Sequence, residues 1–123
     1  MVKDLNIPIE ICSVRTVRES DGLAISSRNV YLDQEGRTRA ARINEILSET
    51  AARLYAGHQP PKELTNATAQ LIEKVGAPPE YIELCDEDTL VPVVELKAPA
   101  RLMLAITVNR TRLIDNWPVP PPQ

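Results

Sequence analysis

The side chains best suited to chemistry in this chain gather in one short polar run. Two adjacent hydroxyls, Ser26 and Ser27, precede the guanidinium of Arg28, a few residues after an Asp21-Gly22 turn dipeptide. Gly22 can take the positive φ that such a turn requires. Hydroxyls donate and accept over short distances, and a planar guanidinium matches the oxygens of a phosphate. The run therefore indicates a loop that holds a polyphosphate, although Ser-Ser-Arg-Asn is also found in ordinary turns and helix caps.

Two other groups of reactive side chains indicate no site. His58, the only histidine, has no Asp, Glu or Cys at ligand spacing, so we expect an exposed loop residue rather than a base or metal ligand. The acidic run Asp86-Glu87-Asp88 could hold a cation, but such runs are more often solvated or cap a turn. We expect Asp88 to cap the turn that follows it. The sequence thus predicts no metal site.

Composition narrows the function classes. The 14 Lys and Arg residues against 17 Asp and Glu give a net charge of −3, which argues against a general nucleic-acid binder. No apolar run is long enough to span a membrane and no leader pattern is present, so we expect a cytoplasmic protein that binds no membrane. Cys12 and Cys85 are too few for a disulfide framework and are expected in the core.

An apolar segment at the N-terminal end predicts a strand over Ile7–Val14. Ile7, Ile9 and Ile11 share one face, and Cys12 makes the other face apolar as well. This pattern is typical of a strand buried on both sides in a parallel sheet, yet the chain offers no obvious partner for it. The unpaired edge predicts self-association, by strand pairing or by docking onto a second copy.

An amphipathic helix is expected directly after the polar run. Asp33 is a good N-cap, and apolar residues three or four apart predict a helix over 34–56. Gly36 weakens its first turn slightly, and Gly57 ends it.

The remaining elements complete an α+β fold. A second helix is expected to begin at Pro61 and to close at Gly76, with an apolar stripe of Leu64, Ala67, Leu71, Ile72 and Val75. Three strands are expected after it, over Tyr81–Cys85, Arg101–Val108 and Thr111–Asn116, and an Asn109-Arg110 turn joins the last two. We predict a three-stranded antiparallel sheet packed against two helices on one face.

The polar run extends into a longer motif. Residues 18–32 have the form Arg-Glu-x-Asp-Gly-Leu-Ala-x-Ser-Ser-Arg-Asn-x-Tyr-Leu, which closely resembles the pantoate–β-alanine ligase (pantothenate synthetase) family. Thr111-Arg112-Leu113-Ile114-Asp115-Asn116 is a second similarity, and Tyr81-Ile82-Glu83-Leu84 with Thr89-Leu90-Val91-Pro92 also fits. The likeness covers nearly the whole chain, from about residue 4 to residue 116.

The resemblance implies an ATP-dependent ligase. Such an enzyme forms pantoyl adenylate and pyrophosphate from pantoate and ATP, and the amine of β-alanine then attacks the mixed anhydride. By this resemblance Ser26, Ser27 and Arg28 contact the ATP phosphates, and Arg28 is the catalytic residue that steadies charge as pyrophosphate leaves. Val17 matches a position whose main chain holds the adenine. Ile25 stands where the family has Met or Leu and contacts the nucleotide.

The same resemblance implies that half of the machinery lies outside this chain. The family's His-x-Gly-His motif and pantoate-binding glutamines belong to an N-terminal nucleotide-binding α/β domain, and this sequence has no His-x-Gly-His. We therefore expect residues 1–15 to be the orphan last strand of that domain, 16–117 a C-terminal lid-like domain, and 118–123 a disordered Pro-rich tail. Pantoate, β-alanine and Mg²⁺ would bind mainly to the missing domain, and the chain alone would be inactive.

The sequence departs from the family at two places and leaves two other functions open. Arg15 replaces the usual Pro after the first strand, which makes the loop geometry less defined, and Asn109 stands near a usual Gly. A stand-alone, non-catalytic nucleotide-binding or structural module is one alternative. A piece of another class I adenylating enzyme, such as a tRNA synthetase, is a second, although the chain lacks an RNA-reading basic stripe.

Overall fold

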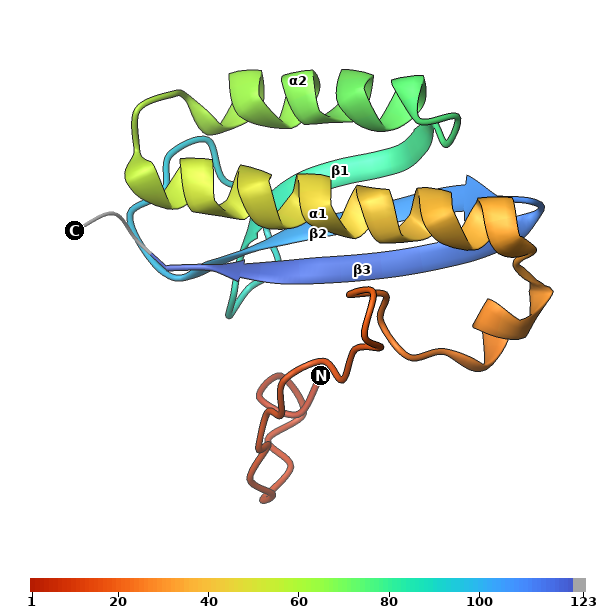
Figure 1. The fold of residues 1–123 in the computed structure, drawn as a ribbon. Helices are drawn as coiled ribbons and strands as arrows, with labels where there is room; N and C mark the ends of the chain where they lie inside the picture. Colours follow the sequence, from red (N-terminus) through yellow and green to blue (C-terminus); the bar gives the residue numbers. More distant parts are fainter. Residues whose placement is uncertain (121–123) are drawn as a thin grey trace.

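The fold has two layers, with both helices lying across one face of an antiparallel sheet (Figure 1). The computed structural model describes residues 1–120. Its elements are η1 (Ser27–Tyr31), α1 (Gln34–Ala56), α2 (Pro61–Lys74), β1 (Pro79–Asp86), β2 (Ala100–Val108) and β3 (Thr111–Val119). The strand order is β1-β2-β3 with both pairs antiparallel, which confirms the predicted α+β class, sheet and helix pair.

Helix α1 begins and ends where its caps predict. The Asp33 side chain accepts the N–H of Gly36 at 2.7 Å, and Gly57 ends the helix in the left-handed conformation. The same Asp33 oxygen accepts a hydrogen bond from the side-chain amide of Asn109 at 2.6 Å. A Cβ on Gly36 would lie 2.5 Å from that amide nitrogen, so Gly36 allows the β2–β3 turn to approach the helix.

Helix α2 begins at Pro61 as expected, but its buried face differs from the predicted stripe. Leu64 and Ile72 are buried, whereas Ala67 and Leu71 are exposed. Thr68 is buried instead, and its hydroxyl lies 2.8 Å from that of Thr50 in α1. The contact between the helices is therefore partly polar. Each hydroxyl also lies within hydrogen-bond distance of a carbonyl of its own helix.

Strand β2 is the centre of the sheet and the core. The side chains of Leu102, Leu104, Ile106 and Val108 are buried against the helices, as the alternation predicts. Val108 pairs with Thr111 across a two-residue turn in which Asn109 and Arg110 have φ of 48° and 65°. Positive φ at both positions defines a type I′ hairpin, which matches the twist of the two strands.

The strand predicted over Ile7–Val14 is wrong. These residues form no strand, and Ile11 and Val14 are 68% and 89% exposed. A strand needs a neighbour for its backbone groups, and no neighbouring strand lies beside this segment in residues 1–120. The predicted self-association by strand pairing loses its basis here, and Cys12 is exposed, whereas Cys85 is buried as expected.

At the other end, β3 is longer than predicted. It includes Pro118 and Val119, which the sequence reading placed in the Pro-rich tail, and Val119 is buried. Pro118 is tolerated because β3 is an edge strand. Residues 121–123 of the predicted tail lie outside the described residues. None of the helices in the described part of the chain is both long and apolar enough to cross a membrane.

Candidate functional site

The Ser-Ser-Arg run is carried by a loop that folds back on itself. The Ile25 N–H donates to the Val17 carbonyl at 3.0 Å, and the Glu19 N–H donates to the Leu23 carbonyl at 2.8 Å. Gly22 closes the turn between them with φ of 86° and donates to the Glu19 carbonyl at 2.9 Å. The Asp-Gly turn that the sequence predicts is therefore present.

Arg18 fastens the base of this loop to the sheet. Its two terminal nitrogens donate to both carboxylate oxygens of Asp115 in β3, at 2.8 and 2.9 Å. The guanidinium also donates to the side-chain oxygen of Asn44 at 3.0 Å and to the Gly22 carbonyl at 3.1 Å, and lies 4.7 Å from the centre of the Trp117 ring. The side chains of Arg18 and Asp115 are only 19% and 13% exposed, so this is a largely buried, bidentate ion pair.

A second group of contacts holds the loop to α1. Arg37 donates to Glu19 at 2.6 Å and to Asp21 at 2.9 Å, and the Asn29 amide donates to Glu19 at 3.2 Å. Hydrogen bonds from Arg37 and then Asn29 lower the pKa of Glu19 below its usual value. Their contribution to stability is thus complete at neutral pH and is lost as the pH falls through the lowered pKa. Leu23 is buried beneath the turn, so the loop is packed against the domain.

The hydroxyls and the guanidinium occupy the start of η1. The Ser26 hydroxyl caps this short helix by accepting the Arg28 N–H at 3.2 Å, and Ser27 is exposed at its first position. Ile25, Ser26 and Arg28 line a pocket of about 320 Å³, whereas Val17 and Ser27 do not line it. Val17 reaches the site through its carbonyl bond to Ile25. The structure thus brings three of the five predicted nucleotide contacts to one cavity.

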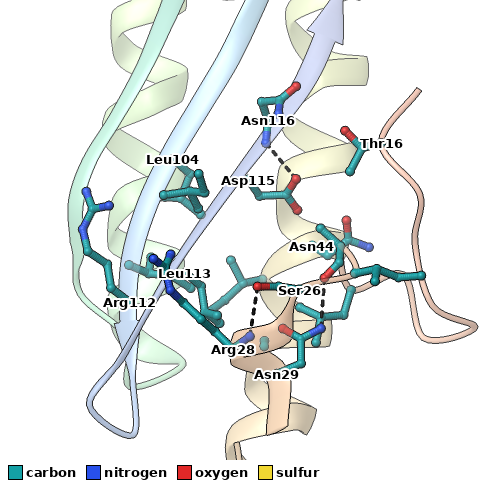
Figure 2. Close-up of a pocket in the computed structure, with 17 residues that line it drawn as sticks. Thr16, Ser26, Arg28, Asn29, Asn44, Leu104, Arg112, Leu113, Asp115 and Asn116 are labelled. Carbon is teal, nitrogen blue, oxygen red and sulfur yellow. Dashed lines mark hydrogen bonds between the residues drawn. The ribbon is translucent and has the colours of Figure 1, made fainter. Parts of the chain in front are cut away.

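The other walls of this pocket come from α1, β2 and β3. Figure 2 shows Asp115 and Asn116 on β3 on the side of the pocket away from Ser26 and Arg28. The Asn29 side-chain oxygen is buried without a partner among the described residues. Sequence reasoning missed Asn29, Asn44 and Asp115 as site residues. The sequence could have indicated Asn29 and Asp115, because Asn29 belongs to the first motif that carries the resemblance and Asp115 to the second.

The remaining sequence candidates lie elsewhere. His58 is exposed after α1, as expected. The cap of the acidic turn is Asp86, not Asp88, because its side-chain oxygen accepts from the backbone N–H of Asp88 and from both the N–H and the hydroxyl of Thr89. These bonds lower the pKa of Asp86, those from Thr89 most. Residues 1–120 contain no group of three or more His, Cys, Asp or Glu side chains placed to hold a metal.

The geometry of the loop predicts a large effect of Gly22→Ala. A Cβ there would lie 2.2 Å from the side-chain nitrogen of Asn44, and the left-handed φ is itself unfavourable for alanine. We expect a loss of about 2–3 kcal/mol in urea-induced unfolding. Gly76→Ala is the matched control, because Gly76 has φ of 84° but its Cβ would meet only ordinary contacts with Arg39. Equal losses in the two variants would show that the contact with Asn44 carries no strain.

Comparisons with known proteins agree with the motifs. The family model described as Pantoate-beta-alanine ligase matches residues 1–118. A pantothenate synthetase of Chelativorans sp. (strain BNC1) is 43% identical over 122 residues, which are 99% of this chain and 43% of that protein. The chain thus spans less than half the length of this curated relative.

Solved structures share the fold as well. A pantothenate synthetase from Thermus thermophilus superimposes with a TM-score of 0.84 at 36% identity, over 98% of this chain and 44% of its own. A pantoate-beta-alanine ligase from Francisella tularensis, solved in complex with beta-gamma ATP and β-alanine, has a TM-score of 0.59 at 32% identity, over 94% of this chain and 36% of its own. With 118 of its 123 residues matched by the family model, the chain belongs to the pantoate-beta-alanine ligase family.

Proposed function

We propose that this chain is the C-terminal, lid-like part of an ATP-dependent ligase that joins pantoate to β-alanine. Pantoate and ATP would form pantoyl adenylate and pyrophosphate, and the β-alanine amine would then displace AMP. The observation that carries this proposal is the pocket at η1, where Ser26 and Arg28 of the family motif meet Asp115 and Asn116 of the second motif. The Francisella tularensis relative, complexed with beta-gamma ATP and β-alanine, supports these ligands.

The proposal gives each residue of the loop a task. Ser26, Ser27 and Arg28 bind the phosphates of ATP, the main chain of Val17 holds the adenine, and Ile25 contacts the nucleotide. Arg28 is exposed and pairs with no carboxylate in residues 1–120, so its full set of donors is available to the charge that develops as pyrophosphate leaves.

The remaining ligands belong to other parts of the ligase. The pocket residues do not fit Mg²⁺, because Asp115 is the one carboxylate among the described lining residues and both its oxygens bond Arg18. We assign Mg²⁺, pantoate and β-alanine to the N-terminal part that the relatives possess, with residues 16–117 acting as its lid. We also propose that the ligase is cytoplasmic and binds no nucleic acid or membrane. We further propose that it is a homo-oligomer, which the exposed apolar side chains of Ile9 and Ile11 support by offering a surface for docking onto a second copy.

Joining this chain to the N-terminal portion of the Chelativorans relative tests the proposal. The fusion should form pantothenate from pantoate, β-alanine and ATP, whereas this chain alone should form none, because in-line transfer needs both substrates held against fixed donors. The measurement is pantothenate and pyrophosphate production by purified protein. The N-terminal portion alone is the control, and equal activity with and without this chain would contradict the proposal and favour a non-catalytic module.

A further inference from the structure

A second pocket lies next to the first and is dominated by arginines. It has a volume of about 400 Å³, opens to solvent, and is lined by Arg28, Tyr31 and the four residues 109–112. Three of its six lining residues are arginines in a protein whose net charge is −3. Arg28 and Arg112 line both pockets, so the two cavities are neighbours that share these side chains.

The charge of this second pocket is mostly uncompensated. Arg112 pairs through its Nε with Glu80 at 2.9 Å, and no ion pair in residues 1–120 uses its two terminal nitrogens. Arg28 and Arg110 form no ion pair with any carboxylate in that same part of the chain. Arg28 and Arg110 therefore leave two uncompensated positive charges at one cavity, and a bound anion would neutralise them.

The backbone at Arg110 adds an independent observation. Arg110 is the second turn residue of the type I′ hairpin and has φ of 65°, a conformation that favours glycine. An arginine is a poor choice for this position on conformational grounds. Strain of this kind is often found where a side chain is needed at a binding site.

We propose that Arg28, Arg110 and Arg112 form one anion pocket that takes inorganic pyrophosphate. This identity of the anion rests on the proposed function, in which pyrophosphate leaves from the phosphates that Ser26 and Arg28 hold. The forked donors of Arg110 and Arg112 match the oxygens of a diphosphate, and the β2–β3 hairpin carries both. The hairpin turn is thus a second wall of the proposed phosphate site.

The test is a titration of the chain with sodium pyrophosphate at constant ionic strength. ¹⁵N-labelled protein reports where the anion binds, and calorimetry gives the dissociation constant. We expect the largest amide shifts at Arg28, Tyr31 and 109–112, and Arg110→Gly should weaken binding by about tenfold, the effect of losing one charge-assisted contact. The same variant should keep its Tm or raise it by about 2–4 °C, because glycine suits the turn.

Arg53→Gln is the matched control, since it removes the same charge from an exposed position that lines neither pocket. Equal binding by Arg110→Gly and the unaltered chain would overturn the inference, as would equal weakening by Arg53→Gln or the absence of saturable binding. Arg28→Gln separates the two proposals. If Arg28→Gln weakens pyrophosphate binding while Arg110→Gly does not, the assignment of the hairpin arginines to the anion pocket is wrong. The proposed phosphate role of the Ser-Ser-Arg loop would then stand.

Discussion

Replacing Arg28 with glutamine should lower kcat of the fused ligase by about 10²–10³-fold, the effect of removing one donor aimed at developing charge. Its side chain is exposed and makes no hydrogen bond or ion pair in residues 1–120, so the fold should not change. The measurement is the rate of pyrophosphate release in the adenylation half-reaction, with Tm recorded alongside.

Two companion variants sharpen this result. Arg28→Lys keeps the positive charge but loses the planar fork, and it should recover only part of the rate. Arg53→Gln should leave kcat unchanged. In the proposed reaction β-alanine enters after adenylation, so its KM should change little in the Arg28 variants. Unaltered pyrophosphate release by Arg28→Gln would show that the loop does not act on the leaving group.

Replacing Asp115 with alanine should destabilise the chain by about 2–4 kcal/mol, because it leaves the largely buried Arg18 guanidinium without its counter-charge. Arg18 would keep only neutral acceptors, namely Asn44 and two backbone carbonyls. The measurement is urea-induced unfolding followed by circular dichroism. Hydrogen exchange should also show faster opening in 17–25, the part of the loop that Arg18 fastens to β3.

The control for Asp115 is an exposed ion pair. Glu35 pairs with Arg39 at 2.8 Å, but its side chain is 78% exposed, so Glu35→Ala should change stability by less than about 0.5 kcal/mol. The loss of stability in Asp115→Asn should lie between those of Glu35→Ala and Asp115→Ala, because an amide oxygen can still accept a hydrogen bond from Arg18. A loss for Asp115→Ala no greater than that for Glu35→Ala would mean that the bidentate pair contributes little.

Local signals in the sequence predicted most of the fold. Asp33 and Gly57 mark the ends of α1 because a side-chain cap and a left-handed residue act within one turn of the helix. The alternation along β2 predicted its buried face for the same reason, since a pleated strand separates its two faces without help from distant residues. The Ser26 cap and the Asp21-Gly22 turn are local in the same sense.

What the sequence could not supply depends on contacts between distant residues. Ile7–Val14 has the pattern of a buried strand, but a pattern provides no partner, and these residues remain outside the sheet. Arg18 and Asp115 are 97 positions apart, and nothing in their spacing shows that they meet. Leu71 continues a helical stripe yet is exposed, because Thr68 packs against α1 in its place.

The bonds of Asp33 constrain how residues 18–33, which carry the Ser-Ser-Arg run, can move. The loop is fastened near its start by Arg18 to β3 and at its end by Asp33 to the turn that joins β2 and β3. The segment is therefore held at both ends to the β2–β3 hairpin, and Leu23 and Asn29 between these ends are buried. A large displacement of Arg28 that keeps both bonds would carry the β2–β3 hairpin with it, so the sheet would have to move as well.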